Sequence, residues 1–358
     1  MTLIKVKSRG TDNVSGRRNI AYNGAMRIAQ RATSKTDISS AGYYTVDRFR
    51  VATANSAGRL TMTQETITDL PGFTNAIKFA CTTADTSIAA GEYLQLSQYF
   101  EGQDLQQFAK GTSSAEKVTV SFYVKGNGNA TYMLEMFDGD NTRHNTQQFS
   151  VTSSWNRVSL TFDGDTTGAY DDDNALSLYL NFWLHAGSSY SGGSYTANTW
   201  AANVNNKRAS GISSFFSSTS NTFFITGLQM EVGDSASDFE HRSFQEELTL
   251  CERYFFMTYN YGATIGASSG ASHLGRFLDD TQSYGSLQVP HVQMRTSPTR
   301  VIYNTANGTA GQIRTDSASV AASITGTDIH GGGWIYVNNV SVGKSVSIKC
   351  HLTMDAEL

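Results

Sequence analysis

The sequence predicts an all-β protein with a large β-sandwich, then a short helix, then a second, smaller β-sandwich domain. Apolar and polar residues alternate along several segments, and this two-residue period is typical of a half-buried strand. Clusters rich in Gly and Asn, such as residues 125–129, separate these segments and accept the positive φ angles of tight hairpins. Charged residues make up only 16% of the 358 residues, which is more typical of turn-rich β-proteins than of helical bundles.

The first segment, residues 1–18, is predicted to be an N-terminal arm. It carries two lysines and three arginines among glycines and asparagines, a mixture too polar and irregular for a core element. Either this arm is disordered or it docks onto a larger assembly.

The large sandwich is expected over residues 19–242. Its clearest strands have alternating apolar residues and are predicted at 118–124, 158–162, 176–184 and 222–232. Gly227 lies inside the last of these strands and predicts a β-bulge there.

A helical connector is predicted over residues 243–260. Ser243 is followed three residues later by Glu246, which is the arrangement of a capping box. Apolar residues then recur at helical spacing at Phe244, Leu248, Cys251 and Phe255. The helix either packs on a domain or packs against copies of itself about a symmetry axis.

Residues 261–358 are predicted to form the second β-domain. The composition shifts to Gly, Ala and Ser, and strand patterns return at residues 286–294, 299–303, 333–337 and 345–354. Pro290 and Pro298 flank the first clear strand and indicate a sheet edge.

Charge and hydropathy exclude two kinds of partner. The formal net charge of −4 argues against nucleic acid, because binding to phosphates needs clustered Lys and Arg. No apolar stretch approaches the length of a membrane span, so no membrane insertion is expected. The first residues lack the apolar run of a signal peptide, and we expect synthesis in the cytoplasm and release by lysis or inside a particle.

The three cysteines, Cys81, Cys251 and Cys350, are far apart and odd in number. They predict neither a disulfide framework nor a paired metal or redox motif. We expect buried free thiols, which agrees with a reducing compartment.

An acidic loop over residues 163–174 is the one candidate metal site. Asp163 and Asp165, at the first and third positions, and a glycine at the sixth are typical of a calcium loop, and Asp171 is a further oxygen ligand. Asn174 replaces the bidentate Glu of such loops. The alternative is a solvated acidic loop without metal, and no other cofactor is expected.

No catalytic motif is present, and the seven histidines are scattered singly. Glycoside cleavage needs two carboxylates facing each other across a sugar, which an acidic loop does not establish. The sequence therefore predicts a protein that is not an enzyme.

The loop over residues 185–200 is the predicted recognition surface. It mixes Tyr, Ser, Gly, Asn and Trp, as adaptable binding loops do. Tyr190, Tyr195 and Trp200 would offer rings to sugar C–H faces, and Asn198 would offer an amide. The alternative is that the loop packs over the sandwich, or against a neighbouring chain, with its aromatic rings buried.

Several motifs occur in order along residues 18–257, namely residues 18–26, 29–31, 44–49, 98–103, 164–168, 227–233, 239–242 and 251–255. Together these segments resemble a family of bacteriophage virion proteins. The family consists chiefly of tail-fibre-like proteins that carry a jelly roll of the carbohydrate-binding-module type. Residues 292–299 extend the match to small C-terminal β-domains of similar proteins. The resemblance implies that the large sandwich is a jelly roll.

The resemblance also implies a virion surface protein, often trimeric, that contacts host glycans. We expect a short tail fibre or receptor-binding protein on the tail or capsid surface. Its expected partners are two further copies of itself, other virion proteins through the arm, and a host surface polysaccharide. The alternatives are a capsid decoration or head-fibre protein with an assembly role, and a polysaccharide depolymerase.

Overall fold

The computed structural model describes most of the chain. The described residues are 18–268, 273–277, 284–287, 289, 291–315, 318–325, 333–337 and 347–358. The predicted arm lies outside them except for Arg18, as does Pro290.

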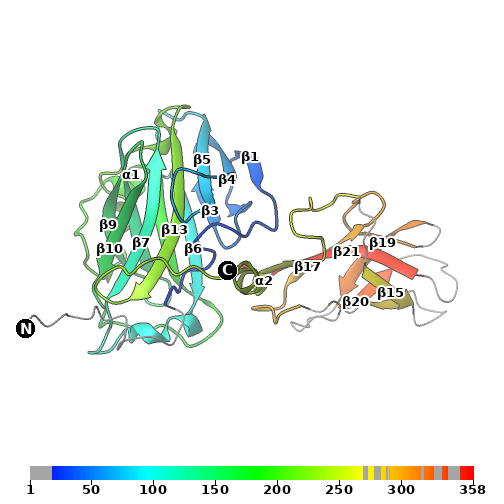
Figure 1. Cartoon of the computed structure of the whole chain (residues 1–358). Coiled ribbons are helices and arrows are strands. Elements are labelled where there is room, and N and C mark those ends of the chain that lie inside the picture. The colour runs from blue at the N-terminus through cyan, green and yellow to red at the C-terminus, as the bar shows by residue number, and fades with distance from the viewer. Residues whose placement is uncertain are drawn as a thin grey trace, which may run out of the picture.

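Two antiparallel sheets face each other in a jelly-roll sandwich (Figure 1). In spatial order, the first sheet consists of β1 (Ser34–Ile38), β4 (Arg59–Thr66), β5 (Asn75–Thr83), β13 (Thr222–Val232), β7 (Val118–Gly126) and β10 (Asn156–Phe162). The second sheet consists of β12 (Ala201–Ala202), β9 (Arg143–Val151), β8 (Ala130–Asp138), β11 (Leu176–Ala186), β6 (Tyr93–Glu101), β3 (Arg50–Ala54) and β2 (Gly42–Tyr43).

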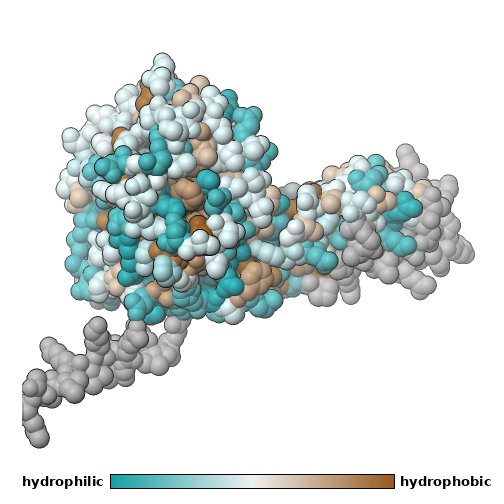
Figure 2. All heavy atoms as spheres, turned by 45° about the horizontal axis from the view of Figure 1, so that its top comes forward, coloured by the Kyte–Doolittle hydropathy of each residue, from teal (hydrophilic) through white to brown (hydrophobic). Residues whose placement is uncertain are grey.

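The main core fills the space between these two sheets. Alternate residues of each strand point into it, because successive side chains of a strand face opposite sides of the sheet. On β11, for example, Leu180 and Phe182 are buried in this core, whereas Asn181 and Trp183 lie on the other side of the sheet. On the face shown in Figure 2, hydrophobic residues occur in small areas between hydrophilic ones.

The strands predicted from alternation are present in β7, β10, β11 and β13. The bulge predicted at Gly227 is confirmed: its φ is 63°, and the pairing of β13 with β7 shifts register between Thr226 and Gln229. A side chain at this position would meet the rings of Phe73 and Tyr123 at about 2.8–2.9 Å, so only glycine fits.

Short helices connect the strands. They are η1 (Gly102–Asp104), η2 (Gln106–Phe108), α1 (Ser188–Ser191), η3 (Asn205–Lys207), η4 (Phe215–Ser217) and the longer α2 (Phe244–Glu252). The predicted cap of α2 is confirmed, since Ser243 Oγ accepts the N–H of Glu246 at 3.2 Å. In the described part of the chain, no helix has the length and apolar character needed to cross a membrane.

The third sheet follows α2 and has its own core. In spatial order it consists of β14 (Phe255–Met257), β21 (Ser347–Asp355), β15 (His273–Phe277), β16 (Tyr284–Leu287), β20 (Gly333–Val337), β19 (Ser319–Thr325) and β18 (Gln312–Arg314), and β17 (Thr299–Asn304) pairs with β21. Because β18 also pairs with β21, the sheet curves back on itself. The predicted all-β class, with a jelly roll, a short helix and a second β-unit, is confirmed.

Two local expectations need correction. β14 lies within the range predicted as a helical connector, so the third sheet already begins at Phe255. The strand predicted at residues 286–294 is instead β16, Tyr284–Leu287, and the described residues 291–298 are irregular. All three cysteines are buried and free, as predicted.

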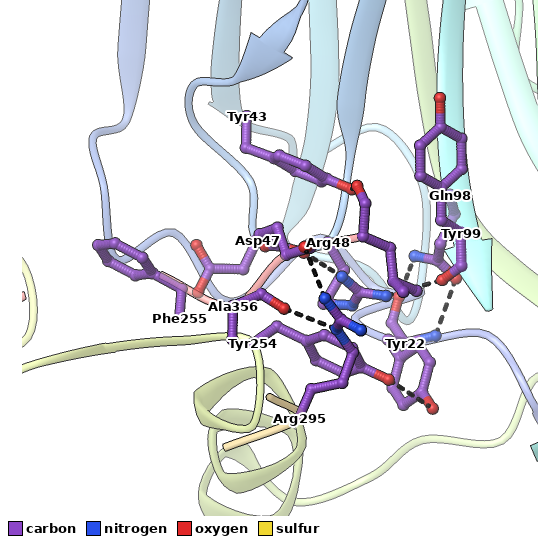
Figure 3. A network of polar contacts seen from close by, with 12 residues as sticks. Tyr22, Tyr43, Asp47, Arg48, Gln98, Tyr99, Tyr254, Phe255, Arg295 and Ala356 are labelled. Carbon is purple, nitrogen blue, oxygen red and sulfur yellow. Dashed lines mark hydrogen bonds and ion pairs between the residues drawn. The ribbon is translucent and has the colours of Figure 1, made fainter. Parts of the chain in front are cut away.

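A buried polar junction joins the sandwich to the third sheet (Figure 3). Arg48 is fully buried; its guanidinium pairs with Glu357, donates to the carbonyl of Tyr99 at 2.7 Å and lies 3.4 Å from the ring centroid of Tyr254. Burial alone would lower the pKa of Arg48, but Glu357 and the tyrosines raise it. The C-terminal residues are thereby held between the two units, next to α2 (Figure 1).

Further contacts extend this junction. Arg31 pairs with Asp355 at 2.9 Å and with Glu357 at 3.3 Å. Arg295 donates to the carbonyls of Ala356 and Asn174, both at 2.8 Å. One network of polar contacts therefore holds together residues that are more than 100 positions apart in the sequence.

We expect Arg48→Met to destabilise the protein by roughly 3–5 kcal/mol, because it leaves Glu357 buried with part of its charge uncompensated. Urea unfolding measures this loss. Lys117→Met is the control, since Lys117 pairs with Asp163 at the surface, where both side chains are about half exposed, and it should change stability little. Equal midpoints for the two variants would contradict a structural role for the junction.

Candidate functional site

Three aromatic side chains form a row across the outer face of the second sheet. Tyr99 pairs with Tyr179, and Tyr179 pairs with Phe137, so the three lie side by side on β6, β11 and β8. The ring centroids of Tyr99 and Tyr179 are 4.7 Å apart and those of Phe137 and Tyr179 are 5.4 Å apart, both in edge-on contact. Tyr179 and Phe137 are half-buried. We call Tyr99, Tyr179 and Phe137 the aromatic row.

A guanidinium lies beside each end of the aromatic row. Arg208 lies 4.5 Å from the ring centroid of Phe137. Arg50 lies 5.6 Å from that of Tyr99 and donates to its hydroxyl at 3.0 Å. A guanidinium has five N–H donors. The row therefore combines flat apolar rings with donors that can reach a ligand placed on it.

Glu135 fixes this face from beneath. It is fully buried and accepts two hydrogen bonds from Arg208, at 2.6 and 2.8 Å. It also accepts from Asn181 Nδ2 and Trp183 Nε1, both at 2.9 Å, and contacts the ring of His144 at 3.4 Å. Burial alone would raise the pKa of Glu135, but Arg208 and these hydrogen bonds lower it to about 2.

The predicted recognition loop covers one end of the same face. Trp183 is buried with Met133 and Ala209, and Tyr190 and Tyr195 pack against this cluster. The ring centroid of Tyr190 lies 5.2 Å from that of Trp183. Both tyrosines are half-buried, which agrees with the alternative that the loop packs over the sandwich.

Asn198 and Trp200 hold the start of the acidic loop. Trp200 Nε1 donates to the carbonyl of Asp163 at 2.7 Å. Asn198 accepts the N–H of Asp163 at 2.8 Å and donates to its carboxylate at 3.0 Å. The loop residues thus have internal contacts, and their assignment as glycan ligands stays a prediction.

The predicted calcium ligands do not come together. Asp165 is bound by Arg143 at 2.7 and 3.1 Å and by Lys110 at 3.3 Å, so cationic side chains occupy its coordination sphere. Asp163 pairs with Lys117, and Asp171 is exposed. Among the described residues, no three His, Cys, Asp or Glu side chains are grouped as metal ligands. The arrangement contradicts a calcium site built from these three carboxylates.

The sequence pattern does not single out the aromatic row. One signal for it existed: Tyr179 occupies an outward position in the alternating run that became β11. Phe137 and Tyr99 occupy outward positions on the neighbouring strands.

No protein-family model and no curated protein matches the chain. Among solved structures, a carbohydrate-binding module of family 4 is 10% identical, with a TM-score of 0.31, and the match covers 59% of this chain and 98% of that one. The enzymatically active domain of tailspike protein 4 from bacteriophage CBA120 is 11% identical, with a TM-score of 0.30 and coverages of 60% and 21%.

A third structure, the module TmCBM61 in complex with β-1,4-galactotriose, is 11% identical, with a TM-score of 0.29 and coverages of 61% and 100%.

We expect Glu135→Gln to remove a pH-dependent part of the stability. The pKa of Glu135 is lowered from 4.5 to about 2 in the folded state, so its ionised form stabilises the fold above pH 4.5. This stabilisation is lost as the pH falls from 4.5 to about 2. At pH 7 the variant should be less stable by on the order of 3 kcal/mol.

Thermal unfolding measured from pH 2 to pH 7 tests this. Glu65→Gln is the control, because Glu65 pairs with Lys78 at the surface. If Glu135→Gln keeps the pH dependence of the unmodified protein between pH 2 and pH 4.5, the role given to Glu135 is wrong.

Proposed function

We propose that the chain is a glycan-binding component of a bacteriophage virion and that the aromatic row contacts the host polysaccharide. The observation that carries this proposal is the row itself: three adjacent rings on one sheet face, with Arg50 and Arg208 at its two ends.

The chemistry of the row suits a saccharide. Sugar rings have flat C–H faces that pack against aromatic side chains, and hydroxyl rims that accept hydrogen bonds from guanidinium groups. The rings are fixed by the strand pairing of β6, β11 and β8. A rigid surface loses little conformational entropy on binding.

Binding without cleavage is the proposed mode of action. Glycoside hydrolysis needs a carboxylic acid with a raised pKa and a second carboxylate facing it across the sugar. Glu135, the carboxylate beneath the row, is buried, is bound by Arg208 and has its pKa lowered to about 2. It is therefore a support for the surface and unsuited to protonate a glycosidic oxygen.

The virion assignment is supported by the ordered motifs over residues 18–257. On this proposal the protein is located on the tail or capsid surface, forms a homotrimer and contacts other virion proteins through residues 1–18. We expect light scattering after size-exclusion chromatography to give about three times the chain mass of 38.9 kDa. A mass equal to one chain would contradict the trimer.

Polysaccharide binding tests the proposed surface. In affinity electrophoresis through gels that contain bacterial capsular or lipopolysaccharide O-chains, at least one polysaccharide should retard the protein. Tyr179→Ala should weaken that binding about tenfold, because it removes the central ring of the row. Tyr123→Ala is the matched control, since Tyr123 is a half-buried tyrosine of β7 in the first sheet.

Trp200→Ala distinguishes glycan binding by the aromatic row from glycan binding by the loop over residues 185–200. If the row binds the glycan, this variant should lower stability, because Trp200 packs on the core, and should keep the affinity of the folded protein. If the loop binds the glycan, Trp200→Ala should weaken the affinity and Tyr179→Ala should leave it unchanged. Absence of retardation by every polysaccharide tested would contradict glycan binding.

A further inference from the structure

A cavity opens at the end of the sandwich, where β6 passes into η1 and η2. It has a volume of about 280 Å3 and is lined by Ile20, Tyr22, Gln103, Asp104 and Gln107. We call it the η1 pocket. Small-molecule sites usually have volumes of roughly 300–1,000 Å3, so this pocket has room for one small ligand.

The polar groups of the η1 pocket keep unused hydrogen-bonding capacity. Asp104 Oδ2 accepts from the hydroxyl of Tyr22, and no described residue donates to Asp104 Oδ1. Gln103 donates its amide N–H to Glu101 at 2.7 Å, which leaves its carbonyl oxygen to the pocket. Gln107 is exposed and makes no side-chain hydrogen bond to any described residue.

Tyr22 forms a fixed part of the pocket wall. Tyr22 is almost fully buried and stacks on Phe100 with ring centroids 6.0 Å apart. Its hydroxyl accepts from the hydroxyl of Tyr254 at 3.3 Å, and that contact ties it to the buried junction (Figure 3). A pre-formed wall of this kind loses little freedom when a ligand binds.

We propose that the η1 pocket is a second carbohydrate-binding position that takes a single sugar unit. A sugar offers several adjacent hydroxyl donors, which match one carboxylate oxygen and two amide carbonyls. The Gln107 amide N–H can donate back to a hydroxyl or ring oxygen. Two neutral amides beside a single carboxylate fit a neutral polyol better than a cation.

The η1 pocket is separate from the aromatic row. The row meets β6 at Tyr99, whereas the pocket begins beyond the end of that strand, at Gln103. Between them, Arg253 holds Glu101 with hydrogen bonds of 2.8 and 2.6 Å. The two positions can therefore be tested independently.

Saturation-transfer NMR with the full chain tests the proposal. The probes are the methyl glycosides of glucose, galactose, mannose and N-acetylglucosamine, each offered alone. At least one should receive saturation from the protein, and Gln107→Ala and Asp104→Asn should each weaken its binding about tenfold. If the Asp104→Asn variant unfolds, Gln107→Ala still tests the pocket, because the exposed Gln107 side chain makes no hydrogen bond to any described residue.

Tyr123→Ala, on β7 of the first sheet, is the matched control and should leave this monosaccharide signal unchanged. Retardation by polysaccharide in Tyr179→Ala reports on the row, whereas the monosaccharide signal in Gln107→Ala reports on the η1 pocket. Failure of the row and failure of the η1 pocket therefore give different results. Absence of saturation transfer to all four glycosides would overturn the proposal. So would equal signals from the unmodified protein and Gln107→Ala, or a signal from n-butylammonium chloride in the absence of any from the sugars.

Discussion

The ion pair between the buried Glu135 and the partly buried Arg208 is the contact on which the outer face of the second sheet depends. A fully buried carboxylate is stable only when its charge is compensated and its oxygens are hydrogen-bonded. Side chains from β11 and from the segment after η3 meet both needs here. Because Arg208 is bound to Glu135 on one side, its guanidinium is fixed above Phe137. The same pair therefore supports the sheet and shapes the aromatic row, in which Tyr179 and Phe137 are half-buried and Tyr99 is buried.

The aromatic row is also connected to the far end of the chain. Arg48 donates to the carbonyl of Tyr99 and pairs with Glu357, 309 residues along the sequence. The junction that holds the third sheet is thus anchored on the strand that carries the first ring of the row. A change that opens the junction would remove a backbone support from the proposed glycan surface.

Local patterns predicted much of the fold. Alternation located β7, β10, β11 and β13, and the Ser243 cap located α2, because each signal lies within a few neighbouring residues. The candidate site depends on distant contacts instead. The acidic loop resembled a calcium loop until Arg143 and Lys110, 22 and 55 residues before Asp165, proved to surround that carboxylate. Alternation likewise predicted that Tyr179 faces outward, but which outward residues the 187–212 segment leaves uncovered depends on tertiary packing.

The most direct test is a crystal structure of the full chain soaked with a fragment of a polysaccharide that retards it. If the aromatic row is the binding surface, a sugar ring should lie against Tyr179 and Phe137, with a hydroxyl or carboxylate within hydrogen-bond distance of Arg50 or Arg208. A fragment bound instead to Tyr195 and Trp200, with the row empty, would contradict the account.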